Sequence, residues 1–282
     1  MGSFALDQAA GLRRMLAGAR PRVFTFVSAT SEEDKSAMLV NLGASLAQVG
    51  SDVLLLDASA AASGVAARLQ AARGASLLQV ARGERSIDEV IQLMPQGFGL
   101  ARLSHGALNG VFRSKEEIAR VGQAFDSLAQ KVDIVAIDGI LNPDDSFPIP
   151  AMASGEIVIQ VANSAASIKS AYSIIKRLAS QLGRRSFGVL VTGATDEEAT
   201  VVYANMAQAA SRYLALQLTS MGSVPADDHL KRASRLGRSV VDAFPQAGAS
   251  HAFRKLAGRF AAAERPAPGM RGMPVSGVNF GV

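Results

Sequence analysis

Seven short apolar runs recur along the 282-residue chain and constrain its fold more than any other feature. Several are unbroken Val/Ile/Leu stretches, which indicates strands buried on both faces of a parallel sheet. Segments of helical periodicity, such as residues 114–132 and 164–183, separate them. The runs occupy residues 22–28, 52–57, 97–104, 132–138, 155–162, 186–193 and 218–225. This alternation predicts an α/β fold, a doubly wound and mostly parallel sheet with helices on both faces.

The two ends of the chain depart from this pattern. Residues 1–20 hold a short amphipathic stretch and a linker-like "GARP", and residues 264–282 are rich in Pro and Gly. We therefore expect an N-terminal arm over 1–20, one domain over 21–263 and a disordered tail over 264–282.

The composition of the chain indicates the cell compartment in which it functions and limits the classes of ligand that it can bind. The chain has no cysteine, which excludes disulfides and thiolate metal sites. Its first residues make a poor signal peptide, and no apolar run approaches the roughly 18 to 20 residues of a membrane span. The net charge of +5 is dispersed over helical segments, with no Trp and three Tyr, which disfavours a nucleic-acid groove. We expect a cytoplasmic protein that makes no direct contact with nucleic acid.

A Lys-Ser pair, Lys35 and Ser36, follows the first apolar run and opens a helical pattern. Strand, loop and Lys-Ser are typical of a phosphate-binding loop, but here the loop reads "TSEED" and lacks glycine. Glycines are needed because such a loop turns its N–H groups inward, with some residues at positive φ. Like charges about 4 Å apart cost about 1 kcal/mol in water and about 4 kcal/mol near a protein surface. The three acids therefore weigh against a bound triphosphate.

The same loop residues suit the start of a helix. Ser31 and Asp34 have the spacing of a capping box, as do Thr30 and Glu33. Acids in a first turn also complement the helix dipole. We infer that the protein's own carboxylates occupy the place of phosphate and that Lys35 pairs with one of them. The alternative is that the acids point outward and ATP still binds.

The order of these pieces resembles the MinD/ParA group of P-loop ATPases and, within it, the FlhG/FleN-type flagellar regulators. The resemblance spans roughly residues 5–262 and is carried by "DQAAGLRRM", residues 23–59, "VDIVAIDG", and the later helices "SIKSAYSIIKRL" and "VPADDHLKRASRLGRSVVDAFPQAGASHAFRKLA". It implies a site for ATP and Mg²⁺. The positions that match the family's nucleotide site are Lys35, Ser36, Asp57, Asp138, Thr192 and Asp227.

The loop departs from the family's glycine-rich pattern. Thr30 stands where the family has a lysine that bridges a dimer. The loop glycines are replaced by Ser31, Glu32 and Asp34, with Glu33 at the variable position. The loop therefore lacks the lysine on which an ATP-dependent dimer depends in the family, and we expect a monomer or a weak dimer.

Other matched positions are also altered. Asp57 is kept, but Ser59 replaces the acid that helps position the attacking water, and Thr192 replaces an adenine-reading Asn. Asp227 matches an acid that caps a helix near the base. Asp138 matches the Walker B acid; with Ser36 it would hold Mg²⁺ if Mg·ATP binds, and its alternative role is to cap the next turn. We expect that the protein does not hydrolyse ATP. We also expect that it binds no cofactor, and the alternative is that it binds ATP and Mg²⁺.

No other catalytic or metal-binding pattern stands out. The three histidines, His105, His229 and His251, lack metal-ligand spacing. We expect ordinary surface or capping roles for them.

The N-terminal arm reads as a short amphipathic helix. Phe4, Leu12 and Met15 fall near helical spacing, and Asp7 is placed to cap the helix. Such a helix either folds back on the domain or docks on a partner. In the family this segment binds and stimulates FlhF, an SRP-type GTPase, and the matching residues are Asp7, Gln8, Ala9, Leu12 and Arg13.

We therefore expect a regulator of flagellar number or placement, a pseudo-ATPase that docks on the FlhF-type GTPase. Further partners in the family are flagellar switch-complex proteins and a flagellar transcription activator. The alternatives are an active ATP switch that dimerises and binds membrane, and a domain that takes a phosphate-free ligand in the same crevice. Residues 253–264 fit either a basic amphipathic helix that binds membrane or the last packing helix of the domain. Placement at the cell pole or the inner membrane would then come through partners.

Overall fold

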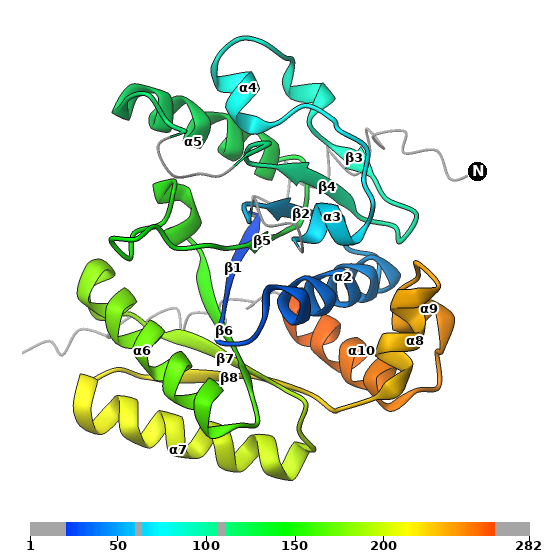
Figure 1. Ribbon diagram of the computed structural model, residues 1–282, viewed down its shortest axis with the longest axis vertical. Coiled ribbons are helices and arrows are strands. Elements are labelled where there is room, and N and C mark those ends of the chain that lie inside the picture. The colour runs from blue at the N-terminus through cyan, green and yellow to red at the C-terminus, as the bar shows by residue number, and fades with distance from the viewer. Residues whose placement is uncertain (1–20, 60–63, 107–110, 263–282) are drawn as a thin grey trace, which may run out of the picture.

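The computed structural model of the chain describes residues 21–59, 64–106 and 111–262 (Figure 1). The expected arm and tail lie outside these ranges. So do the five expected partner-binding residues, Asp7, Gln8, Ala9, Leu12 and Arg13.

Within the described ranges, eight strands form one sheet in the order β3-β4-β2-β5-β1-β6-β7-β8. All neighbouring pairs are parallel except β3 and β4. The strands are β1 (Arg22–Ser28), β2 (Val53–Asp57), β3 (Gln92–Leu93), β4 (Gly99–Arg102), β5 (Ile134–Asp138), β6 (Glu156–Ala162), β7 (Phe187–Thr192) and β8 (Leu218–Val224). All seven predicted runs are confirmed as strands. The added strand, β3, has two residues, too few to show a periodicity.

Helices cover both faces of this sheet, which confirms the predicted fold class (Figure 1). One hydrophobic cluster joins the sheet to α4 (Leu77–Ala81), α5 (Lys115–Ala129), α6 (Ala165–Leu182) and α7 (Asp196–Leu214). The other joins it to α2 (Glu32–Gln48), α3 (Val65–Arg68), α8 (Asp228–Arg235), α9 (Val240–Ala243) and α10 (Gly248–Ala261). Two short 3-10 turns, Ile87–Glu89 and Pro150–Ala153, complete the described elements.

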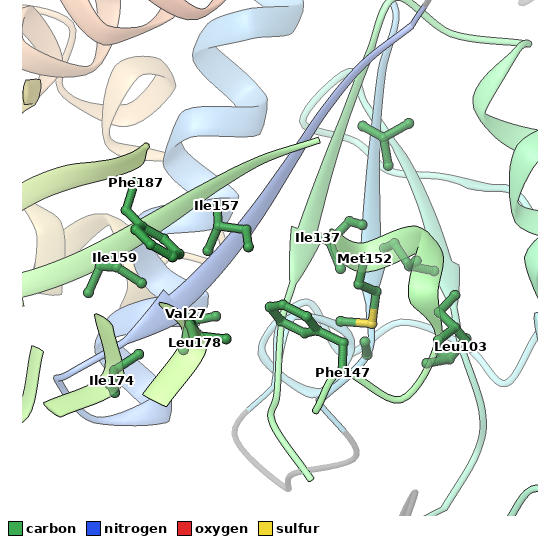
Figure 2. Packing of buried hydrophobic residues seen from close by; sticks show 14 of the residues in the cluster. Val27, Leu103, Ile137, Phe147, Met152, Ile157, Ile159, Ile174, Leu178 and Phe187 are labelled. Atoms are coloured by element: carbon green, nitrogen blue, oxygen red, sulfur yellow. The ribbon is translucent and has the colours of Figure 1, made fainter. Parts of the chain in front are cut away.

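The inner strands β1, β2, β5, β6 and β7 contribute alternate residues to the two clusters, as the pleat of a sheet requires. In β1, Val27 belongs to the first cluster, whereas Phe24 and Phe26 belong to the second. Figure 2 shows part of the first cluster, in which Ile159 of β6 lies near Ile174 of α6. The continuous apolar runs thus reflect burial on both sides.

The chain adds strands first on one side of β1 and then on the other side. β1 lies between β5 and β6; β2 and β4 lie beyond β5, and β7 and β8 lie beyond β6. The crevice at the carboxyl ends of the strands around such a switch point is the usual ligand site of an open α/β sheet. The register of β2 and β5 pairs Asp57 with Asp138 at this end. The fold therefore gathers the matched acids beside the loop that follows β1.

The last described helix, α10, packs into the domain. Phe260 is buried, and its ring centroid lies 4.7 Å from that of Phe24 and 5.9 Å from that of Phe26. The structure favours the packing-helix alternative for residues 253–264, as far as they are described. Within the described ranges, no helix combines the length and the apolar character needed to span a membrane.

Candidate functional site

The loop after β1 leads directly into α2. The helix begins at Glu32 and not at the Lys-Ser pair, so the three acids form its first turn, as the capping-box interpretation of this loop predicted. The cause is Ser31, the N-cap, whose Oγ accepts a hydrogen bond from the Asp34 N–H at 3.1 Å and donates to Asp34 Oδ2 at 2.7 Å. This is half of the predicted Ser31–Asp34 capping box. Thr30 does not cap the helix; its N–H donates to Ser28 Oγ.

Lys35 is buried at the centre of the site, with 1% of its side chain exposed. Its Nζ lies 3.0 Å from Glu32 Oε2 and 2.9 Å from Asp138 Oδ1, and it donates to the Gly139 carbonyl at 2.8 Å. Burial alone would lower the pKa of Lys35, but the charges of Asp138 and Glu32 outweigh it and raise that pKa above its usual value. The ammonium thus makes one hydrogen bond and two ion pairs with oxygens of the protein.

Glu32 is held from a second direction by Ser59. The Ser59 hydroxyl donates to Glu32 Oε2 at 2.9 Å. The residue at the position of the family's water-positioning acid therefore holds the carboxylate that pairs with Lys35. Ser36, the expected Mg²⁺ ligand, donates its hydroxyl to the Glu33 carbonyl at 3.0 Å, within its own helix.

Asp57 and Asp138 hold the chain at the start of α3. The Asp57 carboxylate accepts hydrogen bonds from the N–H groups of Ser59 at 3.0 Å and Ala66 at 2.8 Å. Asp138 Oδ2 accepts one from Val65 N–H at 3.4 Å, so Asp138 caps a neighbouring helix and not the turn after its own strand. Burial raises the pKa of both acids, that of Asp138 to about 6, although Lys35 opposes the shift.

Asp227 joins two helices on the other side of α2. It is the N-cap of α8; its Oδ1 accepts from the His229 N–H at 2.9 Å, and its Oδ2 accepts from Ala249 N–H, in the first turn of α10, at 2.9 Å. The predicted capping role is confirmed. The His229 ring nitrogen Nδ1 also lies 2.7 Å from Asp227 Oδ1, consistent with a capping role for that histidine.

Thr192 lies at the end of β7, beside a buried glutamine of β6. Its hydroxyl donates to the Val161 carbonyl at 3.4 Å, and Gln160 Nε2 lies 3.5 Å from the same oxygen. A cleft of about 360 Å³ extends from Thr30 and Asp34 to Thr192 and Asp227. The structure thus gathers Lys35, Asp57 and Asp138 in one cluster, keeps the Ser36 hydroxyl bonded within α2, and places Thr192 and Asp227 on the adjoining cleft.

Three contributors were missed from the sequence: Arg68, Gly139 and Gln160. Arg68 spans the mouth of the cleft, where its guanidinium donates to the Glu33 carbonyl at 3.4 Å and to Ser234 Oγ at 2.9 Å. Gly139 acts through its backbone carbonyl, which leaves no side-chain signal. Gln160 did leave a signal, because it is a polar residue inside the apolar run "EIVIQVA". In the described parts of the chain, no group of three or more His, Cys, Asp or Glu residues is arranged to hold a metal ion.

Comparisons with known proteins find relatives of similar sequence and solved structures of similar fold. No protein-family model matches it. The Antiactivator FleN of Pseudomonas aeruginosa is 30% identical over 224 residues, which cover 79% of this chain and 80% of the relative. The MinD cell division protein of Aquifex aeolicus has a TM-score of 0.63 at 20% identity, covering 84% of this chain and 95% of that protein. The MinD of Pyrococcus horikoshii, complexed with Mg-ADP, has a TM-score of 0.61 at 17% identity, covering 85% and 95%.

Proposed function

Because this chain belongs to the FlhG/FleN-type branch of the MinD/ParA family of P-loop ATPases, we propose that it is a pseudo-ATPase that regulates flagellar number or placement by docking on partner proteins. One observation carries the pseudo-ATPase half of the proposal. The Lys35 ammonium is enclosed by Glu32, Asp138 and the Gly139 carbonyl. The charge of this lysine is therefore already balanced by two carboxylates of the protein, where a nucleotide site would need it for phosphate.

The residues of the loop do not fit a triphosphate. To reach Lys35, a phosphate would have to displace Glu32, which also breaks the bond from Ser59. The displaced carboxylate would remain near the phosphate charge, at a cost of about 4 kcal/mol for each pair of unit charges about 4 Å apart near the surface. The Ser36 hydroxyl and Asp138 are likewise bonded within the protein, which supports the absence of a Mg²⁺ role.

The regulatory half of the proposal rests on family membership and on the N-terminal segment. The motif residues Asp7, Gln8, Ala9, Leu12 and Arg13 match the segment with which the family binds and stimulates the FlhF-type GTPase. This GTPase is the first proposed partner. The relative from Pseudomonas aeruginosa is named an antiactivator, which supports a transcription activator as a second partner. Switch-complex proteins are a third class.

Calorimetric titration of Mg·ATP into the natural protein and into an E32G/E33G/D34G variant tests the pseudo-ATPase half. We expect no binding heat from the natural protein and a weak gain in the variant, because the variant frees Lys35 from its own loop carboxylate. The melting curve of the variant is the control for folding. Micromolar binding of ATP by the natural protein would show that this half is wrong.

A GTPase assay with the FlhF-type partner tests docking separately. Deletion of residues 1–18 should abolish stimulation, whereas a Lys35→Met variant that keeps the arm should stimulate as well as the natural protein where it is folded. Equal stimulation by the truncated and natural proteins would refute docking through the arm.

A second candidate function is an ATP-driven switch. Lys35, Ser36 and Asp138 are still present, and the MinD of Pyrococcus horikoshii was solved with Mg-ADP. This candidate requires dimers that form on addition of Mg·ATP. Sedimentation velocity at saturating Mg·ATP decides between the two, since the pseudo-ATPase stays in one oligomeric state.

A further inference from the structure

A second pocket lies beside the carboxyl end of β4 and shares no described lining residue with the cleft that adjoins Lys35. Its volume is about 480 Å³, within the range of about 300 to 1,000 Å³ that is usual for small-molecule pockets. The segment before α4, α4 itself, the 3-10 turn Ile87–Glu89 and the loop after β4 contribute to its walls. Its described lining includes three basic residues, Arg73, Arg85 and His105, and one acid, Glu89.

The wall that carries Arg73 is held in place by β4. The Arg102 guanidinium, at the end of β4, donates to the carbonyls of Ala71 at 2.9 Å and Ala72 at 2.8 Å. A parallel β-bridge joins Ser76 to Arg102. The backbone just before and just after Arg73 is therefore tied to the sheet. A ligand in the pocket would meet a preformed wall, which lowers the entropic cost of binding.

Positive charge in this pocket exceeds the negative charge that faces it. Arg73 is exposed and has no hydrogen bond or ion pair with any residue that the structure describes. Arg85 pairs with Glu89 at 3.2 Å, but the two side chains are 56% and 47% exposed, and such pairs contribute little. Glu89 also accepts a hydrogen bond from the Ser86 N–H at 2.8 Å. The guanidinium of Arg73 is thus available to an anion.

The electrostatics of His105 show the same excess of positive charge. Partial burial lowers the pKa of His105, and the charges of Arg102 and Arg73 lower it further, whereas the Gly74 backbone opposes the shift. Arg85 and Glu89 are the other charged groups among the described lining residues. A bound anion would oppose the effect of the arginines and favour the charged imidazolium, so it would raise the pKa of His105. This histidine can therefore report whether the pocket is occupied.

The lining also indicates what kind of anion would fit. Ala75 carries the one apolar side chain among the described lining residues, so a nucleobase or an acyl chain would find little apolar surface. Gln79 lines the pocket with its amide nitrogen unpartnered by described residues, because its Oε1 is the atom that accepts from the Ser76 N–H at 3.1 Å. An amide donor suits the hydroxyl groups of a polar ligand.

We propose that this pocket binds a small phosphate monoester with a polar body, of the chemical class of a sugar phosphate. Arg73 would bind the phosphoryl group, since a guanidinium matches the geometry of phosphate oxygens in a bidentate way. Gln79 would contact the hydroxyl groups of the body. The inference goes beyond the proposed function and does not depend on it, because the pocket contains none of the residues that match the nucleotide site of the family.

Titration calorimetry with ribose 5-phosphate, glucose 6-phosphate and mannose 6-phosphate tests the inference. We expect at least one of them to bind at least about tenfold more tightly than inorganic phosphate, which corresponds to about 1.4 kcal/mol, and its unphosphorylated sugar to give no heat. Arg73→Gln should weaken this binding by at least about tenfold, the loss expected for a charge-assisted hydrogen bond. Arg235→Gln, at an exposed position on α8, is the matched control and should bind as the natural protein does.

Proton NMR of the histidine rings locates the bound ligand, with His105→Gln used to assign the signal. At saturating sugar phosphate, the titration midpoint of His105 should rise by about 0.5 pH units or more, while those of His229 and His251 stay unchanged. If none of the three sugar phosphates binds, or if inorganic phosphate binds as tightly as they do, the inference fails. Binding that persists in Arg73→Gln, or that moves His229 and not His105, would place the ligand elsewhere and overturn the assigned pocket. The pseudo-ATPase proposal is judged separately, by the Mg·ATP titration.

Discussion

The Nζ of Lys35 lies 2.9 Å from Oδ1 of Asp138, and each of the two side chains is only 1% exposed. Burial of two opposite charges is favourable only where further hydrogen bonds complete the shell of each ion. Here Glu32 and the Gly139 carbonyl complete the shell of the ammonium, and Val65 N–H contacts the carboxylate. The pair therefore ties α2 to β5 and α3 as a structural element of the domain.

Replacement of this lysine should destabilise the protein. Lys35→Met leaves Glu32 and Asp138 without their shared cation, and loss of one partner of a buried pair costs about 3 to 5 kcal/mol. Urea unfolding at about pH 7.5 measures the loss. Lys255→Met is the control, because Lys255 forms an exposed pair with Asp196 and such pairs contribute little. Equal stability of both variants would contradict a structural role for Lys35.

The cost of Lys35→Met should also depend on pH. Burial raises the pKa of Asp138 from 3.8 to about 6, so between these values the folded state holds a proton that the unfolded state lacks. The resulting stabilisation is present at low pH and is lost as the pH rises through the folded pKa. Without Lys35 the folded pKa rises further, so the variant keeps losing stability above pH 6. Urea unfolding should therefore show a smaller loss of stability in Lys35→Met at about pH 5 than at about pH 7.5. An equal loss at both pH values would refute the raised pKa of Asp138 as the cause.

Removal of the double cap at Asp227 should destabilise the C-terminal helices. Asp227→Ala removes acceptors from His229 N–H and Ala249 N–H, and loss of an N-cap costs about 0.5 to 2 kcal/mol. Burial raises the pKa of Asp227, but those N–H donors outweigh it and hold the pKa below its usual value. The contribution should therefore be present near neutral pH and lost as the pH falls below about 4. Asp228→Ala, at the exposed neighbour, should cost no more than about 0.5 kcal/mol in the same urea unfolding assay.

The arrangement of the fold could be predicted because burial on both faces leaves a strong pattern in the sequence. Residues such as Leu54 and Leu55 pack into opposite clusters, so β2 has no polar face and reads as a continuous run. The exact start of α2 was not predictable in the same way. The spacings of Ser31 with Asp34 and of Thr30 with Glu33 both suit a capping box, and the structure selects Ser31.

The site was only partly predictable, because several of its contacts join residues that are far apart in the sequence. The pairing of Lys35 with a loop acid follows from helical spacing, since Glu32 lies one turn before it. The contact with the Gly139 carbonyl depends on the register of β5 against β1, which no local pattern encodes. Gln160 could have been noted as a polar residue in a buried strand, but the absence of a hydrogen-bond partner for its Oε1 among the described residues is visible only in three dimensions.

Replacement of the glycine beside Asp138 should disturb the lysine site through the backbone. A Cβ at Gly139 would lie 2.8 Å from both the Phe26 carbonyl oxygen and Thr25 Cγ2, so the strand end must shift. Such overpacking costs about 1 to 3 kcal/mol, and the shift moves the carbonyl that holds Lys35. Gly122→Ala in α5 is the matched control, because no described atom outside its own helix turn lies within 4 Å of the added Cβ. In thermal unfolding, Gly139→Ala should lower the midpoint temperature and Gly122→Ala should raise it. The gain in stability expected for Gly122→Ala is about 0.5 to 1 kcal/mol.

The apolar face of α10 should contribute to stability and not to membrane binding. Phe260 is 1% exposed and packs edge-on against Phe24, so Phe260→Ala should cost about 3 to 5 kcal/mol by leaving a cavity. Val201→Ala, at a 59% exposed position on α7, should change stability little. Co-sedimentation with anionic vesicles supplies the second readout, measured at a temperature where the variant is folded. We expect Phe260→Ala to leave vesicle binding as it is in the natural protein. Loss of vesicle binding without loss of stability would instead identify α10 as a membrane helix whose apolar face leaves the core.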